Sequence, residues 1–408
     1  IYPPMEVDSS VFDDIDYVYI SHIHPDHLHP PSLEKIKKHI PVLIHSFEEK
    51  FLKFKLQGLG RKVIELKHGE CFDCGNDVKI HIYAADNCDV KNSFDFFGLG
   101  KKDGSRNEST GIDTICVIED GEKTVLNVND CPYDLSVDVI KKILNKFGNP
   151  DLLLFPYTGA GSFPQCFENY SVEEKKDRAN MKKNKFLNMG LKYLNECNPK
   201  YYLPFAGGYT LCGKNFELDK FKGQPDSNEI LSFYKKQYAN GQGILLNQFE
   251  SFDMTTEKLS SAYQPIDLKW KDKYCQDVLK NEKYDYEIDE DPSLDQILNL
   301  IQPAYERFSK KRQQLNFSTD KNIYIDLPQD KMVKIKSSND GYETIEKSNF
   351  NDDRYVVYEL DHKLLYRILQ GPRIAHWDNA TVGSHVKFYR KPDVYEKKIH
   401  WCMNYFHS

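Results

Sequence analysis

Three histidines and an aspartate stand close together near the start of this sequence, as His22, His24, Asp26 and His27. They directly follow an apolar run, residues 17–20, of the kind that forms a buried strand. Because alternate side chains of extended backbone point the same way, we expect the first two histidines to face one cavity and the other two residues to come from the following turn. Imidazole and carboxylate together suit zinc, iron or manganese better than calcium or magnesium. The spacing therefore predicts a metal site, and the alternative is a histidine-rich surface loop.

The same segment resembles the His-x-His-x-Asp-His signature of the metallo-β-lactamase superfamily, which stands at the carboxyl end of a core strand. Other stretches are similar to the catalytic domain of the CMP-N-acetylneuraminate hydroxylases, and they cover residues 19–22, 33–36, 127–131, 159–164 and 203–207. The resemblance implies an αβ/βα sandwich followed by a C-terminal α+β extension. It also implies that the first strands of the fold, and any Rieske iron–sulfur module, lie outside this sequence, because few residues precede His22.

Strands and helices alternate after the histidine segment, and this pattern alone indicates the α/β class. We expect strands at residues 63–66, 78–83, 114–119, 124–128, 152–155 and 201–203. We expect helices at residues 32–39, 48–57, 137–147 and 171–195. The Asp120-Gly121 pair between two of the strands predicts a hairpin.

The sequence changes character after about residue 213, where polar and acidic stretches become frequent. A helix is expected at residues 292–310, and the strands of a small antiparallel sheet at residues 323–325, 333–335 and 355–359. We therefore expect two domains. Residues 1–245 would form a metallo-β-lactamase-like catalytic domain, and residues 246–408 a C-terminal α+β domain.

The composition is that of a globular protein, with 40% hydrophobic and 29% charged residues. A net charge of −7 gives no basic footprint, so we expect a small-molecule substrate and no nucleic-acid partner. No apolar stretch is long enough to predict a membrane span. Ten cysteines without a framework spacing indicate a reducing, cytoplasmic compartment. We interpret Cys71-x-x-Cys74 as a reduced turn rather than a metal site.

A dinuclear centre needs more ligands than the signature supplies, and the chain has no histidine between His81 and His362. The superfamily takes two later histidine ligands from that interval. Asp86 follows the expected strand at residues 78–83, where the resemblance places the first of them. A carboxylate there is either a metal ligand or a loop-capping residue.

The second later histidine is replaced by Ala206, which cannot bind a metal. One metal ion would therefore keep an open coordination position. The alternative is that a histidine from the C-terminal region completes the site, and the candidates are His376 and His385. Each of them has a surface or core role as its own alternative.

Asp130 follows the expected strand at residues 124–128, where the resemblance places a carboxylate that bridges two metal ions. A strand-end turn is its alternative role, and Asp113, which precedes another strand, is interpreted as structural. The predicted ligands are His22, His24 and Asp86 on one ion, Asp26 and His27 on the other, and Asp130 between them. The ions would be two divalent metals, iron or zinc, with manganese as a further alternative. Three histidines with three carboxylates favour iron or manganese over zinc.

Glycines and aromatic residues near the expected strand ends are candidates for substrate binding. Gly159 and Gly161 follow a buried strand and permit close approach of the backbone to a ligand. The aromatic candidates are Tyr157, Phe163, Phe205 and Tyr209. They would line a pocket, and packing in the core is the alternative role for each.

Two adjacent metal ions lower the pKa of a shared water and polarise carbonyl or phosphoryl groups. Asp26 would then orient that water or accept its proton. We therefore expect first a hydrolase that cleaves an ester, thioester, amide or phosphoester of a small metabolite. The alternative is a di-iron oxygenase that hydroxylates a sugar nucleotide or another biosynthetic intermediate and needs an electron donor. A non-catalytic metal-binding protein is the third hypothesis.

Overall fold

The computed structural model describes residues 7–98 and 113–408, which fall into two compact units. Unit 1 comprises Ile1–Gly159, Lys183–Gly208 and Pro225–Asp267. Unit 2 comprises Ala160–Lys182, Tyr209–Gln224 and Leu268–Ser408. Because the units alternate along the chain, no single cut separates them. The division into residues 1–245 and 246–408 stays a prediction.

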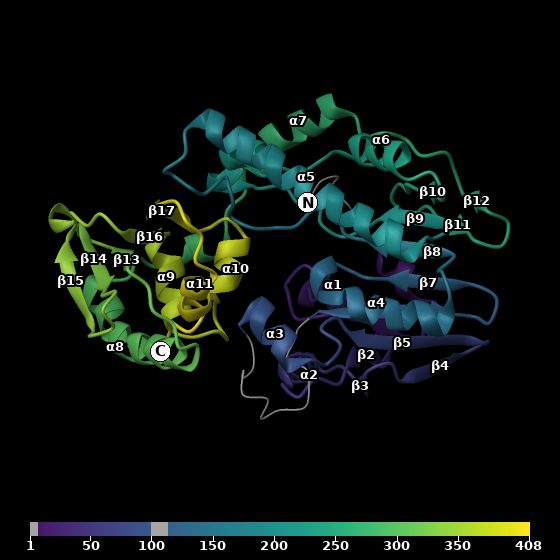
Figure 1. Ribbon diagram of the computed structural model, residues 1–408, viewed down its shortest axis with the longest axis horizontal. Helices are drawn as coiled ribbons and strands as arrows, with labels where there is room; N and C mark the ends of the chain where they lie inside the picture. The colour runs from purple at the N-terminus through teal and green to yellow at the C-terminus, as the bar shows by residue number, and fades with distance from the viewer. Residues whose placement is uncertain (1–6, 99–112) are drawn as a thin grey trace. The chain divides into compact units, whose positions relative to one another are not determined.

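Unit 1 begins with a parallel sheet in the order β1-β2-β3, of which β2 and β3 are labelled in Figure 1. Its strands are β1 (Val18–Tyr19), β2 (Val42–His45) and β3 (Val63–Leu66). The 3-10 helix η1 (Ser9–Phe12) precedes the sheet, and helices α1 (Pro30–Glu34) and α2 (Phe51–Gly58) connect its strands. Apolar side chains of both connecting helices bury against one face of this sheet.

The second sheet of unit 1 has the order β10-β9-β8-β7-β6-β5-β4 over the described residues. Its strands are β4 (Cys71–Gly75), β5 (Val78–Ala84), β6 (Thr114–Glu119), β7 (Thr124–Asn127), β8 (Leu152–Phe155), β9 (Tyr201–Pro204) and β10 (Gln242–Gly243). Pairing is antiparallel from β4 to β7 and parallel from β7 to β10. The hairpin predicted at Asp120-Gly121 joins β6 to β7 and is confirmed. The expected turn at Cys71-x-x-Cys74 is wrong, because both cysteines lie on the edge strand β4.

Four helices follow strands of this second sheet, namely α3 (Val90–Phe97), α4 (Tyr133–Phe147), α5 (Val172–Cys197) and α6 (Ser227–Gln237). The beginning of α5 belongs to unit 2 and the rest of it to unit 1. A two-stranded ribbon of β11 (Phe252–Asp253) and β12 (Lys258–Leu259) completes unit 1.

The buried apolar side chains of unit 1 define four layers. A cluster between the two sheets joins Leu43 and Leu66 of the first sheet to Ile80, Ile82 and Cys116 of the second. Helices α1 and α2 cover the other face of the first sheet. Helices α4, α5 and α6 cover the other face of the second. This order of helix, sheet, sheet and helix confirms the α/β class and the αβ/βα sandwich that the resemblance implies.

The pairing register brings separate loops to one edge of the second sheet. Ala84, at the end of β5, pairs with Thr114 at the start of β6, and Cys116 pairs with Asn127 at the end of β7. The residues that follow β5, precede β6 and follow β7 are therefore neighbours at that edge. The aspartates in these three places are Asp86, Asp113 and Asp130.

Gly190 lies within α5, where this helix packs against the second sheet of unit 1. A β-carbon at this position would lie 2.1 Å from Tyr234 Oη and 2.6 Å from Phe155 Cε2, and both of these side chains are buried. Replacing glycine by alanine in a helix usually stabilises it by about 1 kcal/mol, but overpacking of a buried site outweighs that gain. We expect Gly190→Ala to lower the free energy of unfolding by roughly 2 kcal/mol, measured by chemical denaturation.

Gly58→Ala, at the end of α2, is the matched control, because its β-carbon would meet nothing within 4 Å. The control should leave the free energy of unfolding unchanged or slightly higher. A Gly190→Ala variant as stable as this control would show that the contact between α5 and the sheet is looser than described.

Unit 2 is built on a mixed sheet in the order β15-β14-β13-β16-β17 over the described residues. Its strands are β13 (Asn322–Leu327), β14 (Lys331–Ile335), β15 (Tyr342–Glu346), β16 (Tyr355–Glu359) and β17 (Lys387–Lys391). The expected antiparallel sheet is wrong in one pairing, because β13 and β16 are parallel. Its helices are α7 (Leu268–Asp277), α8 (Leu294–Gln314), α9 (His362–Leu369), α10 (Trp377–Val382) and α11 (Lys397–Met403), with 3-10 helices η2 (Gly213–Phe221), η3 (Leu279–Asn281), η4 (Asp285–Ile288) and η5 (Lys347–Asn349).

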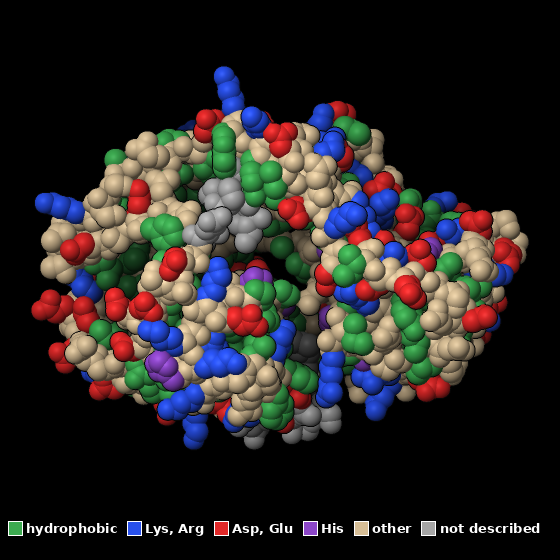
Figure 2. Space-filling model, turned by 180° about the vertical axis from the view of Figure 1, so that it is seen from behind, with side chains coloured by type: hydrophobic (Ala, Val, Ile, Leu, Met, Phe, Trp, Pro, Cys, Tyr) green, Lys and Arg blue, Asp and Glu red, His purple; other side chains and the backbone are tan. Residues whose placement is uncertain are grey.

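The surface carries charges of both signs. On the face drawn in Figure 2, Lys and Arg side chains are interspersed with Asp and Glu side chains. None of the helices in the described part of the chain combines the length and the apolar character needed to cross a membrane. None of the ten cysteines, all of which lie in described residues, forms a disulfide.

Candidate metal centre

His22, His27 and Asp130 converge at the edge of the sandwich, and we call these three residues the histidine–aspartate cluster. One potential ligand atom from each lies within 4.8 Å of the other two. Asp130 Oδ2 is 3.7 Å from His22 Nε2 and 3.5 Å from His27 Nε2. The histidines come from the loop after β1 and the aspartate from the loop after β7, so the meeting of these distant segments depends on the fold.

His24 and Asp26 adjoin this cluster. His24 Nδ1 lies 2.8 Å from His22 Nε2, and Asp26 Oδ2 lies 3.7 Å from His27 Nε2. The Asp26 side chain is 71% exposed, whereas His24 is half-buried. All four residues of the signature are therefore neighbours, and the ligand role of each stays a prediction.

The loop after β1 holds its histidine rings through short-range contacts. Ser21 Oγ lies 3.0 Å from Nδ1 of both His22 and His27. The backbone N–H groups of His27 and Leu28 both donate to the carbonyl oxygen of His24, which closes the turn. Leu28 is fully buried beneath it. Because each Nδ1 already faces the serine hydroxyl, the two Nε2 atoms are turned toward Asp130.

The charge states of the cluster fit a metal centre. Burial lowers the pKa of His22 to about 3, which keeps its imidazole neutral. Burial alone would raise the pKa of Asp130, but the hydrogen bond and charge of His27 outweigh it and hold that pKa at about 2. Within the described residues, Asp130 Oδ1 is buried and has no hydrogen-bond partner. A neutral imidazole beside an ionised carboxylate with an unsatisfied oxygen is the donor set that a divalent ion requires.

Asp113, which the sequence led us to interpret as structural, also faces the cluster. Its Oδ1 lies 4.0 Å from His22 Nε2, and the residue is buried. Burial, together with the charge of Asp130, raises the pKa of Asp113 to about 7. The local sequence gives no signal for this placement, because Asp113 reaches the cluster only through the pairing of Thr114 with Ala84, at the end of the strand before Asp86.

Asp86 fills one of the two roles that the sequence left open. It is buried, and its Oδ1 accepts a hydrogen bond of 3.0 Å from the backbone N–H of Cys88, so it does cap its turn. It also lies close enough to Asp113 to contribute to the raised pKa of that residue. Capping uses one carboxylate oxygen, and the metal-ligand role of the other stays a prediction.

We expect Asp86→Ala to lower the metal content by about one ion per chain, because alanine offers no ligand. Elemental analysis of the dialysed protein measures this. Asp89→Ala is the matched control, since Asp89 also caps a backbone segment, by accepting from the N–H groups of Lys91 and Asn92. Equal metal content in both variants would assign Asp86 to the turn alone.

The six predicted substrate-binding residues are divided between the units. Tyr157, Gly159 and Phe205 belong to unit 1. Gly161, Phe163 and Tyr209 belong to unit 2. These residues differ in how closely they are packed. Phe205 is 42% exposed, whereas Gly159 is so tightly packed that a β-carbon there would lie 2.5 Å from a ring atom of Phe186. Substrate binding by these residues stays a prediction.

Both C-terminal histidine candidates have partners within unit 2. His376 precedes α10, and its Nδ1 accepts a hydrogen bond of 3.1 Å from the backbone N–H of Asp378. His385 Nδ1 lies 3.0 Å from Tyr286 Oη, and its ring packs edge-on against that of Tyr284. Completion of the metal site by either histidine stays a prediction.

No family model matches the chain. A curated relative from Mycobacterium tuberculosis, named as a Rieske 2Fe-2S iron–sulfur protein, is 25% identical over 267 residues, which are 64% of this chain and 48% of the relative. A second relative of the same name, from Mycolicibacterium smegmatis, is 24% identical over 272 residues, with the same shares of the two chains. The chain thus spans about half the length of the curated relatives it matches.

Two solved structures illustrate the distant matches. CmlA, a diiron β-hydroxylase from Streptomyces venezuelae, is 14% identical over 56% of this chain and 44% of its own, with a TM-score of 0.34. An isothiocyanate hydrolase from Delia radicum gut bacteria is 16% identical over 56% of this chain and 73% of its own, with a TM-score of 0.35. Particular similarity to the CMP-N-acetylneuraminate hydroxylases stays a prediction.

The layered fold of unit 1 brings the candidate metal ligands together. Histidine and aspartate side chains from loops far apart in sequence meet at the strand ends of unit 1. The neutral ring of His22 and the ionised carboxylate of Asp130 have electron pairs available to a cation. The chain therefore has an αβ/βα sandwich with a candidate metal centre at the edge of its two sheets.

Proposed function

We propose that this chain is the catalytic part of a dinuclear metal-dependent oxygenase that hydroxylates a small metabolite. The observation that carries the proposal is the carboxylate content of the centre. Asp113 is a buried carboxylate beside His22 in addition to Asp130 and Asp86, so the donor set is richer in oxygen than the signature alone predicts. Oxygen-rich sets with imidazole favour iron or manganese over zinc.

Under this proposal His22, His27 and Asp130 would hold the metals. His24, Asp26, Asp86 and the additional carboxylate of Asp113 would complete their coordination. When bound, two iron ions would supply the redox chemistry by which dioxygen is reduced with electrons from a donor. The reaction consumes the substrate C–H bond, one dioxygen, two electrons and two protons, and yields the C–OH product and one water. Ser21 would keep both histidine rings in their binding orientation, since its hydroxyl lies 3.0 Å from each Nδ1.

The two electrons must come from a donor. The curated relatives are named as Rieske 2Fe-2S proteins, and a Rieske centre is a one-electron carrier. This chain spans about half of each relative, so the relatives' names do not assign a Rieske centre to these 408 residues. They support a partner of Rieske type that donates electrons to this chain. Two successive single-electron transfers would satisfy the balance.

The hydrolase that we expect first from the sequence becomes the second candidate. One observation favours it, namely that Asp26 is 71% exposed and lies 3.7 Å from His27 Nε2. Under the hydrolytic hypothesis this exposed carboxylate would accept a proton from an attacking water. Asp26→Asn should abolish turnover under the hydrolytic hypothesis.

The metals distinguish the two candidates. We would purify the chain without added metal and combine elemental analysis with visible absorption. About two irons per chain with a visible charge-transfer band, and oxygen uptake dependent on an added reductant, are the expected results. Zinc alone, with reductant-independent cleavage of an ester or thioester panel, would contradict the oxygenase and support the hydrolase.

A further inference from the structure

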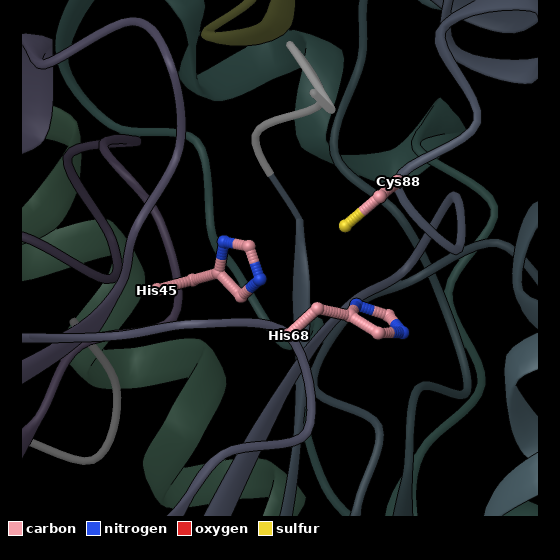
Figure 3. A group of neighbouring side chains, drawn as sticks. All are labelled: His45, His68 and Cys88. Carbon is pink, nitrogen blue, oxygen red and sulfur yellow. The ribbon is translucent and has the colours of Figure 1, made fainter. Parts of the chain in front are cut away.

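Unit 1 contains a second group of potential metal ligands, formed by His45, His68 and Cys88. One ligand atom from each lies within 4.8 Å of the other two. The three side chains come from different segments and face one another (Figure 3). His45 ends β2, His68 follows β3, and Cys88 lies in the turn after β5. No residue of this group belongs to the six predicted ligands of the dinuclear centre.

His45 has the environment of a metal ligand. Its exposed fraction is 4%, and within the described residues neither of its ring nitrogens has a hydrogen-bond partner. Buried polar groups are almost always satisfied, so a buried imidazole with two unsatisfied nitrogens requires an explanation. Burial also lowers the pKa of His45 to about 3, which keeps the ring neutral, the form that binds a metal.

His68 is half-buried and is held by the neighbouring strand. The backbone N–H of Ala84 donates a hydrogen bond of 3.1 Å to His68 Nδ1. This nitrogen is therefore unprotonated, and the ring is neutral. A metal bound through Nδ1 would replace that hydrogen bond, so the amide of Ala84 can report on binding.

The turn that carries Cys88 has an unusual backbone. Asn87 and Cys88 have φ values of 57° and 56°, so two consecutive residues other than glycine adopt the left-handed conformation. Asparagine tolerates this region but cysteine does so rarely. The hydrogen bond from the Cys88 N–H to Asp86 Oδ1 holds the turn in this shape. The turn directs the cysteine side chain toward the two imidazoles (Figure 3).

We propose that His45, His68 and Cys88 form a binding site for a soft divalent cation, zinc before others, next to the dinuclear centre. Two imidazoles with one thiolate suit zinc, cobalt or copper and not magnesium or calcium. Zinc bonds of about 2.0 Å to nitrogen and about 2.3 Å to sulfur require the three atoms to draw together by roughly 1 Å on binding. The fourth position would be left to water or another ligand, and binding would release the thiol proton.

The site would also connect the layers of unit 1. His45 belongs to the first sheet, Cys88 follows a strand of the second, and His68 lies on the connection between them. A bound cation would therefore fix the ends of both sheets beside the dinuclear centre. This makes protease resistance of unit 1 a second property that the cation should change.

Cobalt(II) titration of the metal-free, full-length chain tests the proposal. A thiolate ligand gives a sulfur-to-cobalt charge-transfer band in the near ultraviolet, and a tetrahedral site gives intense visible bands. We expect both in the wild type and in Asp130→Asn, whose dinuclear centre is impaired. We expect Cys88→Ser and His45→Asn to lose the sulfur band and one cobalt per chain. Cys71→Ser/Cys74→Ser, on β4, is the control and should keep the band.

A band that persists in Cys88→Ser, or that disappears in the β4 control or in Asp130→Asn, would overturn the proposal. Alkylation provides a measurement that does not depend on the cysteine variant folding. In the wild type, zinc should protect Cys88 from iodoacetamide by at least about tenfold in rate, as read by peptide mass spectrometry. Protection that is equal in His45→Asn, or absent in the wild type, would also overturn it.

Discussion

Asp130→Asn is expected to reduce the metal content of the dinuclear centre from about two ions to one or none, while the chain stays folded. Asp130 Oδ2 lies within 3.7 Å of both cluster histidines, and Oδ1 is buried and has no hydrogen-bond partner in the described residues. An amide carries no charge, and its nitrogen cannot coordinate a cation. The variant keeps the size of the side chain, so the fold should tolerate it.

Elemental analysis after dialysis measures the metal content, and circular dichroism checks the fold. Asp138→Asn is the matched control, because Asp138 is an exposed carboxylate on α4. The control should keep the wild-type metal content. Full metal content in Asp130→Asn would show that this carboxylate does not bridge or hold either ion.

Asp113→Asn is expected to stabilise the metal-free chain at neutral pH. Burial and the neighbouring Asp130 raise the pKa of Asp113 from its ordinary 3.8 to about 7. An acid whose pKa is raised by folding binds its proton more tightly in the folded chain, so the free energy of unfolding falls as the pH rises between these values. The loss in free energy of unfolding is complete above pH 7 and is at most on the order of 4 kcal/mol. This is an upper value, because the raised pKa of Asp113 depends in part on the charge of Asp130. Asparagine does not ionise, so Asp113→Asn removes this loss.

Chemical denaturation in the presence of a chelator measures this effect at about pH 5 and about pH 8. The stability difference between Asp113→Asn and the wild type should widen from the lower to the higher pH. Asp130→Asn should show no such widening. The Asp130 carboxyl, with a pKa of about 2, stabilises the folded chain to the same extent at both of these pH values, and this stabilisation is lost only as the pH falls below about 4. A constant difference for Asp113→Asn would show that this carboxyl is solvated.

The core strands of unit 1 could be predicted from sequence because each is a short apolar run bounded by turn residues. The predicted bounds of β3, β6 and β8 coincide with those in the structure. The helix α3 was not predicted, although Asp89 caps it by accepting from Lys91 and Asn92. Val90, Phe94 and Phe97 do recur at helical spacing, so the sequence carried a signal for this helix, and the first two of them are buried.

Pairings between distant segments could not be read from the local pattern. The strands β13 and β16 are each recognisable, but their parallel pairing depends on how intervening strands are placed. The same limit applies to the candidate sites. The four signature residues are adjacent in sequence, whereas Asp113 reaches the cluster only through the pairing of Ala84 with Thr114. His45, His68 and Cys88 form no motif, because three separate strands bring them together.

The turn after β5 gives the two candidate sites a thermodynamic linkage. Asp86 is a predicted ligand of the dinuclear centre, Cys88 is a proposed ligand of the neighbouring site, and the carboxylate of one accepts a hydrogen bond from the backbone of the other. A cation that tightens the turn at Cys88 would reposition Asp86 and change the affinity of the dinuclear centre. By reciprocity, the dinuclear metals would change the affinity for that cation by the same factor. Binding of metal at the two sites is then expected to be cooperative, so that occupancy of one site shifts the metal concentration at which the other is filled.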